Sequence, residues 1–112
     1  MNISLDKIKM NVVNTAENGV VNRDTVFSFT QTENIVTAEY AGGRISKGFL
    51  VGICDGSLLT FSFCQLQTDG SLDSGLSSCG IETKENGKLR LTEHFEWKTR
   101  PGEKGINIFE EL

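Results

Sequence analysis

Residues 88–98 read KLRLTEHFEWK, and their side chains alternate strictly in character. The odd-numbered positions carry Leu, Leu, Glu, Phe and Trp, whereas the even-numbered ones carry Lys, Arg, Thr, His, Glu and Lys. Successive side chains of a β-strand point to opposite faces, so this period of two predicts a strand with one buried face and one solvated face. Glu93 is the exception, because it places a carboxyl group in the middle of the apolar face.

The same alternation recurs along the rest of the chain, between regularly spaced turn signals. Asn-Gly or Asp-Gly stands at 18–19, 55–56, 69–70 and 86–87. These dipeptides tolerate the positive φ of tight turns, so they indicate β-hairpins. The runs between the turns are rich in Val, Ile, Phe, Tyr and Thr, which favour strands. The expected strands are 5–14, 24–31, 35–41, 44–54, 58–67, 71–83, 88–98 and 105–111.

Eight one-sided strands joined by short turns must bury their apolar faces together. An open sheet would leave two edges unpaired, and closure removes both edges. The sequence therefore predicts an all-β fold, an eight-stranded antiparallel up-and-down meander that closes into a small barrel, similar to calycin and streptavidin barrels. A two-sheet β-sandwich has the same patterning and is the alternative. Gly48, Gly52 and Gly75 lie inside expected strands and predict bends or bulges there.

Size and composition limit the classes of function. The 112 residues predict a single β-barrel domain, 1–112. The net charge of −4 argues against nucleic-acid binding, which needs a basic surface. No apolar run approaches the roughly 18 residues of a membrane span, so no membrane contact is expected. An odd number of cysteines, three, and an N-terminus unlike a signal peptide predict a cytoplasmic protein.

Polar side chains on the inward faces are the most informative functional signal. A buried polar group without a partner costs about 1–3 kcal/mol, so these groups should bond to each other, to water or to a ligand. Glu93 is expected to point inward and to pair with an arginine, such as Arg44 or Arg90, or with inward glutamines. The candidate ligand-binding residues are Gln31, Tyr40, Gln65, Gln67, Glu93 and Trp97. In the alternative interpretation, they mark a barrel mouth where strand ends meet water.

Motifs of catalysis and metal binding are lacking in the sequence. The cysteines, Cys54, Cys64 and Cys79, form no Cys-x-x-Cys pair, and the one histidine, His94, falls on a polar outer face. There is no Gly-x-Ser-x-Gly sequence and no phosphate-binding loop. We therefore predict no metal, no cofactor and no catalytic residue.

The sequence leaves three functions open. The first is a binding module that holds a small organic ligand inside the barrel or at one mouth. The second is an interaction protein that forms a homodimer through its outer surface, where Thr60, Ser62 and Cys64 make a small neutral stripe. The third is an enzyme, for which no constellation of residues can be named.

The whole chain resembles a group of small bacterial proteins of about this length. The similarity is carried by YAGGRI at 40–45, GFLVG at 48–52, the acidic pair at 110–111 and, most specifically, GKLRLTEHFEW at 87–97. The resemblance implies a shared fold. Members are often labelled N-acetylglutamate synthase, which would imply acetyl transfer. Acetyltransferases bind pyrophosphate at a helix N-terminus, and the sequence predicts no such helix.

Overall fold

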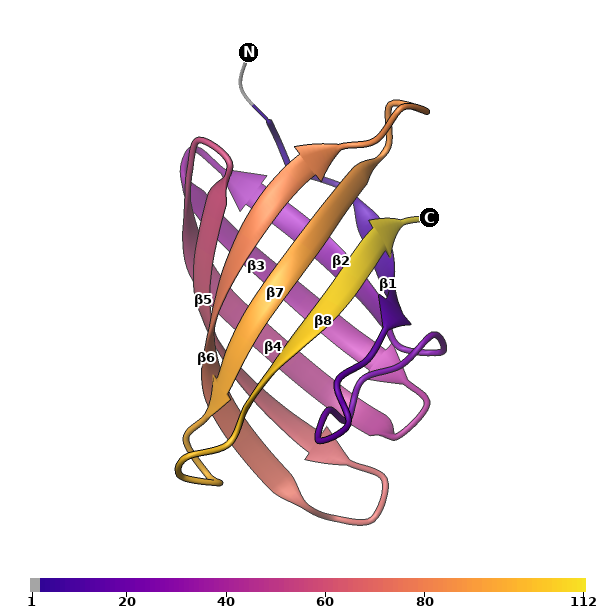
Figure 1. The fold of residues 1–112 in the computed structure, drawn as a ribbon, viewed down its shortest axis with the longest axis vertical. Coiled ribbons are helices and arrows are strands. Elements are labelled where there is room, and N and C mark those ends of the chain that lie inside the picture. Colours follow the sequence, from indigo (N-terminus) through magenta and orange to yellow (C-terminus); the bar gives the residue numbers. More distant parts are fainter. Residues whose placement is uncertain (1–2) are drawn as a thin grey trace.

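The computed structural model describes residues 3–112, which form eight antiparallel strands in chain order (Figure 1). The strands are β1 (Lys9–Asn14), β2 (Val26–Thr32), β3 (Ile35–Gly42), β4 (Ile45–Asp55), β5 (Leu58–Gln67), β6 (Leu72–Thr83), β7 (Leu89–Trp97) and β8 (Lys104–Glu111). Each strand pairs with the next, and β1 also pairs with β8, so the sheet closes into a barrel. The predicted up-and-down barrel is confirmed, and the sandwich alternative is wrong.

The first strand is the one whose predicted start was clearly misplaced. The sequence predicted it from residue 5, but β1 begins at Lys9. Lys7 has a φ of 63°, which turns the chain before the strand starts. The turn lets the Leu5 side chain enter the barrel, where it is fully buried. The other seven strands begin and end within two residues of their predicted limits.

The barrel interior is packed mainly with aromatic and aliphatic side chains. The five odd-numbered residues of β7, Glu93 included, are buried, whereas His94 is exposed on the outer face, as the alternation predicted. The Phe27 and Tyr40 rings stack with their centres 4.2 Å apart. The Phe63 and Trp97 rings meet edge to face at 5.5 Å. Such aromatic pairs add stability beyond the area that they bury.

The glycines inside the strands adjoin side-chain rings of neighbouring strands. The ladder shifts register next to Gly48, between Ile45 and Lys47, whereas it pairs without a bulge at Gly52 and Gly75. A Cβ atom at Gly48 would overlap the Tyr40 ring, and one at Gly75 would overlap Phe63. These glycines therefore make room for rings on the neighbouring strands.

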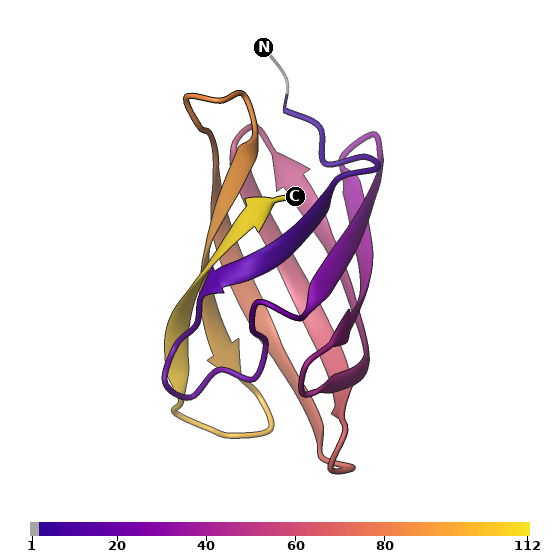
Figure 2. The ribbon, with the colours of Figure 1, turned by 90° about the vertical axis from the view of Figure 1, so that its right-hand side faces the viewer.

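The two ends of the barrel differ. The chain termini and the β2–β3, β4–β5 and β6–β7 turns lie at one end (Figure 1). The β1–β2, β3–β4, β5–β6 and β7–β8 connections lie at the other, which we call the mouth end (Figure 2). The longest connection there is the β1–β2 loop, residues 15–25, which brings Val20 and Val21 into buried positions. Within residues 3–112 there is no helix of the length and apolarity needed to cross a membrane.

Candidate ligand-binding site

A narrow internal pocket lies in the mouth half of the barrel. The β1–β2 loop closes part of it with Gly19, Val20 and Val21. Aromatic rings from β2, β3, β5 and β7 form most of the remaining wall. The polar side chains in the wall are Tyr40, Gln65, Glu93 and Asn107. About 20 Å³ of the pocket is open to the centre of a water molecule, which is room for on the order of one ordered water.

Glu93 supplies the carboxyl group of this pocket and is only 5% exposed. The Ser77 hydroxyl donates a hydrogen bond to Glu93 Oε2 at 2.6 Å, and Asn107 Nδ2 donates to Oε1 at 3.0 Å. Burial raises the pKa of Glu93, and these two hydrogen bonds act in the opposite direction. Both partners are uncharged, so no described residue of the pocket wall neutralises an ionised Glu93.

The predicted partners of Glu93 were wrong, although its inward orientation was right. Arg44 lies at the mouth and donates to Gln67 instead. Arg90 belongs to the outer face of β7, where its guanidinium lies 2.8 Å from Glu110. The alternation explains this result, because an even-numbered β7 residue cannot reach an odd-numbered one through the sheet.

Tyr40 and Trp97 also line this pocket, and each carries a buried polar group. The Tyr40 hydroxyl donates to Gln65 Oε1 at 2.8 Å, and burial raises the pKa of Tyr40. Trp97 is 3% exposed, and its buried Nε1 has no hydrogen-bond partner among residues 3–112. An unsatisfied buried donor costs about 1–3 kcal/mol, so the indole N–H is a place where a bound acceptor would gain free energy.

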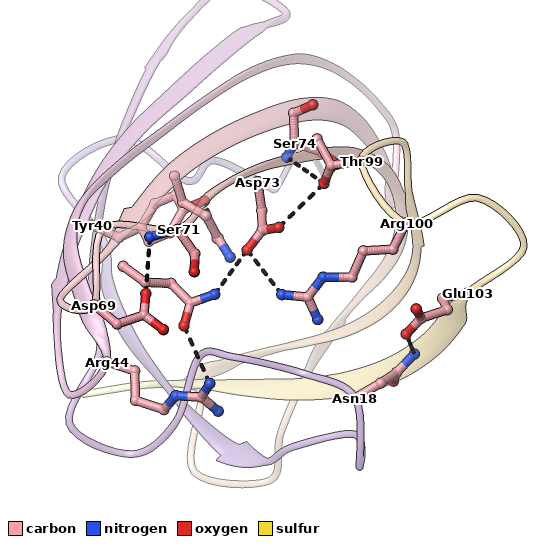
Figure 3. A network of polar contacts seen from close by, with 12 residues as sticks. Asn18, Tyr40, Arg44, Asp69, Ser71, Asp73, Ser74, Thr99, Arg100 and Glu103 are labelled. Atoms are coloured by element: carbon pink, nitrogen blue, oxygen red, sulfur yellow. Dashed lines mark hydrogen bonds and ion pairs between the residues drawn. The ribbon is translucent and has the colours of Figure 1, made fainter.

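A chain of polar contacts crosses the mouth end beyond the pocket (Figure 3). Arg44 donates to Gln67 Oε1 at 3.2 Å, and Gln67 Nε2 donates to Asp73 Oδ2 at 2.8 Å. Arg100 donates to the same carboxylate oxygen at 3.0 Å, and its guanidinium lies 4.4 Å from the Trp97 ring centre. Figure 3 shows Arg44 and Arg100 on opposite sides of Asp73. We call these four residues the mouth cluster.

The structure brings together four of the six predicted site residues. Tyr40, Gln65, Glu93 and Trp97 line the pocket, and Gln67 lies next to it in the mouth cluster. Gln31 does not belong to the site, because it lies near the opposite end. There it accepts a hydrogen bond from the Leu5 backbone N–H at 2.9 Å and donates to the Glu33 carbonyl at 2.8 Å.

Sequence reasoning missed three polar residues that the structure places in or near the site. They are Asp73, Ser77 and Asn107. A signal for Asn107 was present, since it shares its face with Phe109 two residues later. Ser77 likewise precedes buried Cys79 by two. The part of the chain that the structure describes contains no cluster of three or more His, Cys, Asp or Glu side chains placed to hold a metal ion.

The fold is compatible with two kinds of barrel. A closed eight-stranded up-and-down barrel has an interior that side chains fill or that holds one small ligand. In a comparison with protein families, the avidin-like protein family model matches residues 3–112. The chain therefore belongs to the avidin-like family of small-ligand-binding barrels. Comparison with curated proteins gives no match. Nothing in these comparisons supports the N-acetylglutamate synthase label.

Proposed function

We propose that this protein binds a small organic ligand in the pocket at the mouth end. The observation that carries the proposal is the polar content of that pocket. A barrel that served only as a scaffold would be stabilised better by an apolar interior, since buried polar groups bring a desolvation cost. Here Tyr40, Gln65, Glu93 and Asn107 meet in one place inside the barrel, next to the unpaired indole N–H of Trp97.

The size of the pocket limits how the ligand binds. The interior holds on the order of one water, so only a compact group of the ligand enters without rearrangement. A larger ligand must displace part of the β1–β2 loop or the mouth cluster. Val20 and Val21 of the loop are buried, and the Thr15 hydroxyl donates a 3.0 Å hydrogen bond to the Val21 carbonyl. The bulk of a larger ligand would therefore lie at the mouth.

Trp97 provides a direct test, because it is the only tryptophan in the chain and lines the pocket. Native mass spectrometry of freshly purified protein identifies a co-purified ligand, and Trp97 fluorescence then reports its rebinding. Gln65→Met is expected to weaken binding on the order of tenfold, because it removes the partner of the Tyr40 hydroxyl. Gln31→Met is the matched control at the opposite end and should bind normally. Equal weakening by both variants would contradict the proposed location.

A second candidate function is self-association, which the outer surface of β4, β5 and β6 favours. The uncharged outward side chains of these strands form an exposed surface, which we call the outer wall, and the exposed charged residues Lys47, Asp55 and Glu82 lie toward the strand ends around it. Its residues are Phe49, Val51, Ile53, Leu58, Thr60, Ser62, Cys64, Leu66, Leu72 and Leu76. Val51 is 57% exposed and Leu72 66%. Exposed apolar surfaces of this kind are typical of protein interfaces, and a second copy would bring an identical wall.

Sedimentation velocity tests the second candidate. The wild type is expected to sediment above the 12.3 kDa of one chain at micromolar concentration. Val51→Lys places a charge in the centre of the outer wall and should shift the protein to monomer. Thr30→Lys adds the same charge to the outer face of β2 and should leave the assembly intact. A wild type that remains monomeric would remove this candidate.

A further inference from the structure

The ionisable groups of the pocket wall include an acid but no base. Among residues 3–112, Glu93 is the single carboxyl group in the pocket wall, and no lysine or arginine lines it. The nearest cations toward the mouth, Arg44 and Arg100, are held by Gln67 and Asp73. Burying an ionised carboxylate with neutral partners alone costs several kcal/mol, whereas a cation in contact offsets much of that cost. The pocket therefore favours a positively charged occupant over an anion.

Aromatic rings surround this carboxyl group. Tyr40, Phe61, Phe63, Phe95 and Trp97 all line the same space. The faces of such rings carry negative potential and attract organic cations, most strongly when water is excluded. The protein itself uses this chemistry at the mouth, where the Arg100 guanidinium lies over the Trp97 ring and contacts the Asp73 carboxylate. In the pocket, the Glu93 carboxyl group and the aromatic rings offer a cation the same two kinds of contact, farther inside the barrel.

We infer that the ligand of this pocket carries a compact organic cation, an ammonium or guanidinium group, that binds between the aromatic rings and contacts the Glu93 carboxylate. The inference rests on the proposed ligand-binding function and names its ligand class. The small volume of the pocket limits the buried part of the ligand to this cationic group. The remainder of the molecule extends toward the mouth cluster.

The protonation of Glu93 sets the pH dependence of such binding. The other titratable groups that face Glu93 inside the barrel are the Tyr40 hydroxyl of β3 and the Cys79 thiol of β6. Burial raises the pKa of both, so they stay uncharged near neutral pH. Asp73, Arg44 and Arg100 lie farther out, in the mouth cluster. Binding of a cation to the ionised carboxylate requires that Glu93 lose its proton. The affinity for the cation should therefore rise with pH through the Glu93 pKa.

Guanidinium and urea form a matched pair of probes, because both are planar and of similar size but only guanidinium is charged. Each is titrated below its denaturing range, at constant ionic strength, while the fluorescence and the indole N–H resonance of Trp97 are followed. Methylammonium serves as a smaller cation and acetate as an anion. We expect the two cations to bind. Urea and acetate should bind at least about tenfold more weakly, because neither forms a hydrogen bond between opposite charges with the Glu93 carboxylate.

Glu93→Gln is the decisive variant, because the amide keeps the shape of the side chain and removes its charge. It should reduce guanidinium affinity at least about tenfold, to the level of urea. Glu96→Gln removes the same charge from the outer face of β7 and should bind guanidinium as the wild type does. Binding of urea or acetate as tight as that of the cations, or wild-type cation affinity in Glu93→Gln, would overturn the cationic ligand while leaving the pocket a binding site. If no probe perturbs Trp97, the cationic ligand is also refuted, and the co-purified ligand alone then decides the proposed function.

Discussion

Replacement of Glu93 by glutamine should make the stability of the barrel less dependent on pH. Burial raises the pKa of Glu93 in the folded state above its usual value of 4.5. Between these two pKa values the folded protein holds a proton that the unfolded chain has released, so stability falls as pH rises. Below the lower value the carboxyl is protonated in both states, and above the higher value it is ionised in both. The destabilisation therefore begins near pH 4.5 and is complete above the folded pKa.

The magnitude follows from the same linkage. Each pH unit within that window lowers the unfolding free energy of the wild type by about 1.4 kcal/mol relative to a side chain that does not titrate. Glutamine is such a side chain, and its amide can keep both contacts by accepting from Asn107 and donating to Ser77. At low pH the unfolding free energy of Glu93→Gln should thus lie within about 1 kcal/mol of the wild-type value. As pH rises, Glu93→Gln should become increasingly more stable than the wild type until the folded-state pKa is passed.

Urea unfolding followed by Trp97 fluorescence, repeated from about pH 4 to about pH 8, measures this difference. Glu96→Gln on the outer face of β7 separates the local effect from the change in net charge. A difference between Glu93→Gln and wild type that stays constant across the range, or that shrinks as pH rises, would refute the reasoning. It would mean that folding does not change the protonation of this carboxyl group in the stated direction.

Further variants test the packing inside the barrel by the same urea assay. Gly48→Ala should lower the unfolding free energy by about 1–3 kcal/mol, because its Cβ overlaps the Tyr40 ring, whereas Gly80→Ala, which meets nothing within 4 Å, should stay within about 0.5 kcal/mol of wild type. Tyr40→Phe should cost about 1–3 kcal/mol, because it leaves a buried glutamine oxygen without its donor, and a neutral result would show that water replaces the hydroxyl. Leu59→Ala at a fully buried position should cost about 2–5 kcal/mol, whereas Leu58→Ala next to it, half exposed, should cost less than about 1 kcal/mol. Similar costs at the two leucines would contradict the assigned faces of β5.

The strand pattern could be predicted from the sequence because it is a local property. Alternation within 88–98 assigns each side chain to a face without any knowledge of the neighbouring strands, and the structure agrees at every odd-numbered residue of β7. Closure of the barrel followed from the number of one-sided strands and the edges that an open sheet would expose. The role of Gly48 could not be predicted in the same way, because the Tyr40 ring that fills the space above it comes from another strand.

The candidate site was predicted only in part for a related physical reason. The alternation of side chains along each strand predicts that Gln31, Gln65 and Glu93 point inward. It does not predict at which end of the barrel each one lies. Gln31 proved to be near the end with the chain termini, where it supports the Leu5 backbone. The partner of Glu93 depended on the register between neighbouring strands, which sets Asn107 of β8 directly opposite Glu93. Strand register is a tertiary property, and the turn signals alone did not fix it.

Asn107 gives the pocket a connection to the loop that covers it. Its Nδ2 donates to Glu93 Oε1, and its Oδ1 accepts a 2.8 Å hydrogen bond from the Ala16 backbone N–H at the start of the β1–β2 loop. An amide that bonds on both sides cannot rotate without breaking one of the two contacts, so Asn107 links the Glu93 carboxyl group to the backbone of the loop. Val20 and Val21 of this loop close the pocket. A ligand group that takes over one Glu93 oxygen must compete with Asn107, and loss of that bond would loosen the loop at Ala16. If the proposed ligand binds in this way, its entry would be coupled to release of the β1–β2 loop through the Asn107 side chain.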